Sequence, residues 1–299
     1  MKAPSLPLLA FCGCGLIWGS TFLAIRVGND SLPALWACTL RFVLAALILN
    51  AIVLVTRQGW PKGDALKACL WYGFLEFGVS MPLLYWGEKV VPSGLAAVLY
   101  AICPVSAMFT ARLLGMEKLN PRRLGAAILA FGGVAVIFWR ELVFGGSAAG
   151  LAAVFVAATA APLAGLLLQR GPKQNAIGVN AVGTLVGIPF ALLASLALGE
   201  RPVLPTTTAQ WFPVVYLAVM GSVGAFVLFA WLVNHWRATT IAFLGVVVPV
   251  IAVVLGAIAR GETLAPGSLI GAVVVIVGVV VALRNGASRE SELSTNDLA

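Results

Sequence analysis

The stretch Glu117-Lys-Leu-Asn-Pro121 is repeated 145 residues later as Glu262-Thr-Leu-Ala-Pro266. At the same offset, with no gap, other pairs coincide: Trp86 with Trp231, Pro104 with Pro249, Leu119 with Leu264, and Gly133 with Gly278. Chance similarity between apolar helices explains shared Leu, Val and Ala, but it does not explain Trp, Pro and Glu matched at one constant offset. The sequence therefore predicts an internal duplication.

The rest of the chain is mostly apolar, with 61% hydrophobic and 10% charged residues. Soluble domains carry about 25% charged residues. A membrane-spanning helix needs about 20 mostly apolar residues. Ten such segments occur at about 7–25, 33–56, 66–87, 92–115, 121–139, 148–168, 176–198, 211–234, 238–259 and 265–284. The predicted fold class is an all-α integral membrane protein with ten transmembrane helices.

The duplication divides these helices into two five-helix repeats, 7–139 and 148–284, followed by a polar tail, 285–299, for which disorder is expected. Because five is odd, the second repeat enters the membrane from the opposite side. Inverted repeats are typical of transporters that alternate access around a site near the bilayer midplane. The sequence thus indicates a transporter.

Lysine and arginine are distributed unevenly between alternate loops. Thirteen lie on the side of the N-terminus and five on the other, with Arg41 inside a helix. The positive-inside rule then places both termini in the cytoplasm, and we expect the cytoplasmic (inner) membrane as the location. The basic residues form no patch or stripe, so nucleic-acid binding is not expected despite the net charge of +8.

Residues for covalent or metal chemistry are sparse. There is one histidine, no Ser–His–Asp set and no P-loop, and the five cysteines lie in apolar stretches without metal-ligand spacing. We therefore expect no cofactor, no metal site and no direct use of ATP. An integral-membrane enzyme acting on lipid or peptide is a remote alternative.

Two prolines mark where a central site is expected. Pro104 and Pro249 lie near the middle of the fourth and ninth segments, where a proline removes one helical hydrogen bond and frees the carbonyl four residues earlier, here those of Tyr100 and Gly245. Backbone breaks at membrane depth are tolerated where they line a cavity or are buried in protein. A binding site and a packing kink both remain open at this point.

Only Arg41 and Glu76 are ionisable residues well inside the predicted hydrocarbon region. Insertion scales put the cost of such a residue at about 2.5–3.5 kcal/mol, which indicates a partner or a cavity. One interpretation is an Arg41–Glu76 ion pair between packed helices. The other is that Glu76 lines the cavity and binds an ammonium group or a proton.

Aromatic side chains suit a cavity for an apolar or aromatic ligand, although Trp and Tyr also favour membrane interfaces. Freed carbonyls and hydroxyls provide groups for a zwitterion. The candidate substrate-binding residues are Trp18, Phe22, Glu76, Ser80, Tyr100, Pro104, Thr159, Phe243, Gly245 and Pro249.

The stretch Leu16-Ile-Trp-Gly-Ser-Thr-Phe22 resembles the WG-x-x-F signature of EamA-type proteins in the drug/metabolite transporter superfamily. Leu40-Arg41-Phe42 matches the arginine of their second helix, and both halves end with the expected Pro, Glu and glycine-containing helix. The resemblance covers about residues 8–284, but the second half lacks the WG-x-x-F copy and the arginine. It implies a ten-helix exporter of small metabolites, most similar to YddG-type exporters of aromatic and other neutral amino acids.

The resulting prediction is a secondary transporter that exports small neutral metabolites, foremost neutral amino acids. Few buried cations argue against phosphorylated substrates, which need cationic partners. The alternative within transport is multidrug or other metabolite efflux. Proton coupling stays open, and neither the exact substrate nor the oligomeric state follows from the sequence.

Overall fold

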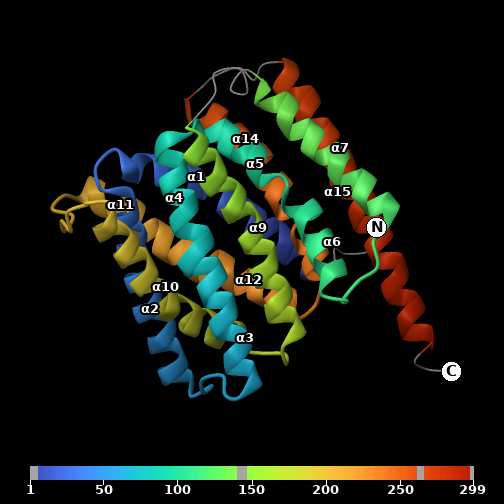
Figure 1. The fold of residues 1–299 in the computed structure, drawn as a ribbon, viewed down its shortest axis with the longest axis horizontal. Helices are drawn as coiled ribbons and strands as arrows, with labels where there is room; N and C mark the ends of the chain where they lie inside the picture. The colour runs from blue at the N-terminus through green and yellow to red at the C-terminus, as the bar shows by residue number, and fades with distance from the viewer. Residues whose placement is uncertain (1–5, 140–146, 261–265, 297–299) are drawn as a thin grey trace.

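The computed structural model describes residues 6–139, 147–260 and 266–296, and every regular element in these ranges is a helix (Figure 1). In chain order the elements are α1 (Leu6–Asn29), α2 (Ala34–Thr56), α3 (Asp64–Tyr72), the π-helix η1 (Gly73–Ser80), α4 (Met81–Val90), α5 (Ser93–Tyr100), α6 (Cys103–Leu113), α7 (Pro121–Ile137), α9 (Ala148–Arg170), α10 (Ala176–Ala197), α11 (Thr208–Tyr216), the π-helix η2 (Leu217–Ala225), α12 (Phe226–Val233), α13 (Ala238–Ile241), α14 (Leu244–Arg260) and α15 (Pro266–Asn296).

Within the described ranges, eight helical segments are long and apolar enough to cross a membrane. Two further crossings complete ten. One is the continuous run α3–η1–α4, which carries the buried Glu76, and the other is α7, which has 17 residues. At 1.5 Å per residue, α7 is about 26 Å long, slightly shorter than a typical hydrocarbon core. The predicted all-α membrane fold with ten helices is confirmed.

Helices that correspond in the two halves pack against each other. Helix α7 lies along α15 on one side of the molecule, and α2 lies along α10 on the other (Figure 1). The helices between them, including α1, α9 and α14, form the centre of the bundle. The centre is therefore enclosed by helices from both halves.

Glycine makes the α7–α15 contact close. A Cβ on Gly133 would lie 2.8 Å from the carbonyl oxygen of Gly271, and a Cβ on Gly278 would lie 2.8 Å from that of Ala126. Without a hydrophobic driving force between helices in lipid, such backbone approach supplies the packing energy. Gly133 and Gly278 are the pair matched at the 145-residue offset, so equivalent residues of the two repeats make equivalent close contacts.

The third and eighth crossings share another feature. The π-helical segment η1 spans Gly73–Ser80, and η2 spans Leu217–Ala225, which is the equivalent stretch at the same offset. π-Helices are rare and occur frequently at functional sites.

The fourth and ninth crossings are interrupted, but not in the same way. The fourth breaks at residues 101–102, directly before Pro104 in the first turn of α6, as predicted. The ninth breaks at 242–243, between α13 and α14, whereas Pro249 lies inside a continuous α14. The expected break at Pro249 is therefore wrong in position, because one missing hydrogen bond does not stop a membrane helix whose other bonds are intact.

The last helix, α15, is described through Asn296. The expected disorder of the polar tail, 285–299, stays a prediction. Glu262, the repeat partner of Glu117, lies outside the described residues.

Candidate substrate cavity

A cavity of about 100 Å³ lies in the centre of the bundle, with walls from α1, α2, α4, α9, α12 and both interrupted crossings. Most of the lining is apolar, with side chains such as Ile25, Leu84 and Val248. Since roughly 10–15 Å³ of such volume holds one water, a small organic molecule fits.

The two interrupted crossings meet at this cavity. A Cβ on Gly245 would lie 2.8 Å from the Cβ of Cys103 and 3.0 Å from the carbonyl oxygen of Tyr100. Tyr100, Cys103 and Gly245 all line the cavity. Pro104 removes the amide that would bond the Tyr100 carbonyl in a continuous helix, and Gly245 leaves room beside that carbonyl.

Half of the predicted site residues line the cavity: Trp18, Glu76, Tyr100, Gly245 and Pro249. Trp18 is held by edge and tilted contacts with Phe226 and Phe229, at 5.1 and 5.7 Å between ring centroids. Such aromatic contacts orient the indole as a wall of the cavity.

The other predicted residues lie elsewhere. Pro104 and Phe243 are buried but do not line the cavity. Thr159 is half-buried, and its hydroxyl donates to the carbonyls of Phe155 and Val156 on its own helix. Phe22 belongs to α1, but its side chain is not among those described.

Ser80 stands behind the cavity wall. Its hydroxyl donates to the carbonyl oxygen of Ala157 at 3.0 Å and lies 3.1 Å from the hydroxyl of Tyr100. Because the single Ser80 proton is directed to Ala157, the Tyr100 hydroxyl is the donor of the second bond. Ser80 therefore orients Tyr100 rather than contacting the cavity.

Arg41 lines the cavity, and among the described residues no salt bridge joins it to Glu76, so the ion pair that was one of the two interpretations is not formed. Its Nε donates to Ser222 Oγ at 2.8 Å and its Nη1 donates to the Tyr85 hydroxyl at 3.1 Å. The guanidinium reaches across to η2, where a Cβ on Gly221 would lie 2.9 Å from Nη2. Only a glycine leaves this space.

Glu76 lies on η1 and is 4% exposed. It lines the same cavity, and no described side chain or amide forms a hydrogen bond or salt bridge with its carboxyl group. The cavity thus contains a guanidinium and a carboxyl group in largely apolar walls.

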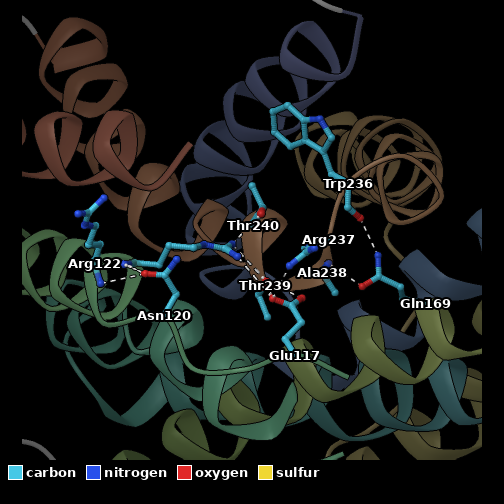
Figure 2. Close-up of polar contacts among 10 residues, drawn as sticks. Glu117, Asn120, Arg122, Gln169, Trp236, Arg237, Ala238, Thr239 and Thr240 are labelled. Atoms are coloured by element: carbon cyan, nitrogen blue, oxygen red, sulfur yellow. Dashed lines mark hydrogen bonds and ion pairs between the residues drawn. The ribbon is translucent and has the colours of Figure 1, made fainter. Parts of the chain in front are cut away.

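A polar cluster lies around Glu117, beside the residues of α13 (Figure 2). The Thr239 hydroxyl lies 3.0 Å from both carboxylate oxygens of Glu117, and the Arg123 and Arg237 Nη1 atoms lie 3.5 and 3.6 Å from Glu117 Oε2. Arg123 Nη2 also donates to Thr240 Oγ1 at 2.7 Å. The cluster joins the α6–α7 loop of the first half to α13 of the second.

Gln169 makes a second connection at the same end (Figure 2). Its Nε2 donates to the carbonyls of Val233 and Trp236 at 3.1 and 2.7 Å, and its Oε1 accepts from the amide of Ala238 at 2.9 Å. The C-terminal part of α9 is thereby tied to the turn between α12 and α13.

Sequence reasoning used Glu117 only as a repeat marker. Its polar partners carry no motif, because threonine hydroxyls and a glutamine amide are common at helix ends. The repeated Glu beside a loop proline was the one available signal. The role of Gly221 had no signal, since a glycine in an apolar helix usually indicates packing.

Comparison with known proteins agrees with this architecture. The chain matches the EamA-like transporter family twice, over residues 5–139 and 145–284. A solved crystal structure, 20% identical, superposes with a TM-score of 0.74 and covers 95% of this chain and 98% of its own. The fold and the family matches define a membrane transporter, and the chain belongs to the EamA-like transporter family.

Curated relatives extend over nearly the whole chain. The "Uncharacterized inner membrane transporter YedA" of Escherichia coli is 29% identical, over 92% of this chain and 90% of its own length. The "Probable terminal-alkyne amino-acid exporter" of Streptantibioticus cattleyicolor is 28% identical over 93% of both. The "Probable amino-acid metabolite efflux pump" of Salmonella typhimurium is 25% identical, over 89% of this chain and 91% of its own.

Proposed function

We propose that this transporter exports small neutral amino acids by alternating access around the central cavity. The observation that carries the proposal is the cavity itself, which is walled by both halves, largely apolar, and contains Arg41 and Glu76. Apolar walls suit an uncharged side chain, and charges of both signs suit a zwitterionic head group. The names of two relatives, an amino-acid exporter and an amino-acid metabolite efflux pump, support the same substrate class.

Alternating access requires that one side of the cavity be closed while the other is open. We assign the closing contact on one side to the cluster of Glu117 with Thr239, Arg123 and Arg237 (Figure 2). Under the positive-inside orientation this side is cytoplasmic, with both termini in the cytoplasm and the protein in the inner membrane. Substrate entry from the cytoplasm then requires this cluster to separate.

The test is transport by purified protein in liposomes. We expect preloaded, radiolabelled leucine, alanine and phenylalanine to exchange faster than in protein-free liposomes, measured with and without a pH gradient to detect proton coupling. The Gly245→Val variant should be inactive, because its side chain would collide with Cys103 and the Tyr100 carbonyl. The matched control is Gly125→Val, where a Cβ meets open space.

Multidrug or other metabolite efflux is the competing function, favoured by the apolar walls. If wild-type protein moves a lipophilic cation but none of the amino acids, that alternative replaces the proposal.

A further inference from the structure

We propose that Arg41 and Glu76 together form a two-charge receptor for the head group of an α-amino acid. The Arg41 guanidinium takes the carboxylate and the Glu76 carboxylate takes the ammonium group. This inference rests on the proposed function and names the substrate groups that the cavity would recognise.

The Arg41 side chain is 1% exposed, and within the described residues no carboxylate oxygen lies within salt-bridge distance of its guanidinium. Its two hydrogen-bond partners, Ser222 and Tyr85, contribute neutral hydroxyl groups. A guanidinium has five N–H groups in a rigid fork that matches a carboxylate. Two are used to fix its orientation, so donors remain for an anion in the cavity.

Glu76 presents the complementary group. A carboxylate that is 4% exposed and accepts no hydrogen bond from a described residue is costly to bury unless a ligand or water supplies donors. An ammonium group supplies three N–H donors and a positive charge. The carboxylate therefore has room for this half of a zwitterion.

The two π-helices anchor different parts of this arrangement. Glu76 projects from η1, and the Arg41 guanidinium is drawn to η2 by Ser222 and by the space at Gly221. If the side chains paired directly, each would satisfy the other and no ligand would be needed. Their separate anchoring lets a zwitterion bridge them.

The chemistry predicts a specific pattern of recognition. A ligand with only the ammonium group leaves Arg41 without its anion, and one with only the carboxylate leaves Glu76 without its cation. Sites with buried polar groups reject analogues that leave those groups unpaired. Leucine should bind, while leucinamide and 4-methylpentanoate should bind poorly.

The experiment is competition against radiolabelled leucine in liposomes containing the whole protein. With wild-type protein, we expect leucinamide and 4-methylpentanoate each to compete at least about tenfold more weakly than leucine, the usual consequence of losing a charge-assisted hydrogen bond. With Glu76→Gln, leucine binding should fall by at least about tenfold. The binding of 4-methylpentanoate should change little, because this ligand has no ammonium group for Glu76.

Further variants keep the test clear of folding defects. Glu76→Asp retains the carboxyl group and should recover part of the leucine binding. Tyr85→Phe and Ser222→Ala each remove one hydrogen bond that orients Arg41, so they should weaken the binding of leucine more than the binding of leucinamide. Equal competition by leucine and leucinamide, or wild-type leucine binding by a folded Glu76→Gln protein, would overturn the two-charge receptor alone. If wild-type protein moves no amino acid, the proposed function itself fails.

Discussion

The π-helical segment of the third crossing, η1, can be compared position by position with its counterpart in the eighth, η2. Glu76, Phe77 and Ser80 of η1 correspond to Gly221, Ser222 and Ala225 of η2 at the repeat offset. The backbone geometry is retained, while the side chains have exchanged a carboxylate for a glycine. Divergence at these positions lets one segment supply an anion and the other accept the guanidinium of Arg41.

This comparison separates two kinds of constraint. Under the proposed alternating access, we expect backbone features shared by both halves, such as the π-helices and interrupted crossings, to serve the motion. Side chains that differ between the halves are expected to serve an asymmetric substrate.

Replacing Gly221 by Asp would make the two π-helices alike in charge. The new carboxylate would lie against the Arg41 guanidinium and neutralise it, so we expect amino-acid exchange to fall by about 100-fold, as for removal of a buried charge partner. The measurement is exchange in liposomes. Gly221→Asn, of the same shape but uncharged, is the control and should retain more activity; equal activity of the Asp variant and wild type would contradict the assignment.

Gly133 and Gly278 test a feature that the halves share. A Cβ on either would lie 2.8 Å from a backbone oxygen of the facing helix, so both Ala variants should lose about 1–3 kcal/mol of stability. We expect the melting temperatures in detergent to fall by similar amounts. Gly132 lies beside Gly133, but a Cβ on it would meet open space, so the melting temperature of the Gly132→Ala control should not fall. A large difference between Gly133→Ala and Gly278→Ala would argue against equivalent packing.

Glu117→Gln weakens the contact between the halves that we propose as the closing contact. The amide still accepts hydrogen bonds but loses its attraction to Arg123 and Arg237, so the closed state should lose about 1 kcal/mol, roughly a fivefold shift in population. Cys103, which lines the cavity, is the reporter in a background with the other cysteines replaced by alanine.

Labelling of Cys103 by a water-soluble maleimide should be faster in Glu117→Gln when the reagent is on the cytoplasmic side. A Lys118→Gln variant controls for loss of a nearby loop charge. Unchanged labelling from that side would show that the cluster is not the closing contact.

Ser80→Ala makes η1 resemble η2 at its last position, where the second half has Ala225. The Tyr100 hydroxyl loses one hydrogen-bond partner, so we expect a stability loss of about 0.5–1.5 kcal/mol and a small change in leucine affinity. Thermal unfolding in detergent measures the first, and competition measures the second. Tyr100→Phe removes the same bond but leaves the bond from Ser80 to the Ala157 carbonyl, so its stability loss should be no larger.

Much of the fold could be predicted from local patterns. Ten apolar segments and the constant offset gave the crossings and the duplication, and Glu76 and Arg41 stood out because charge inside an apolar helix is rare. The position of the ninth-crossing break could not be predicted, since it depends on how α13 packs and not on Pro249 alone. The side-chain contacts of Thr159 and Ser80 depended on which helix face each residue occupies.

The sequence by itself determined that the chain crosses a membrane about ten times, in two related halves, because hydropathy and repeated residues are read along the chain. Only the tertiary structure decided that the Arg41 guanidinium donates to Ser222 and lies against Gly221, and that Arg41 and Glu76 border one cavity. The physical reason is that the partner of a buried charge is set by which helices face each other across the bundle, and residues 41 and 222 are brought together only when the two halves pack.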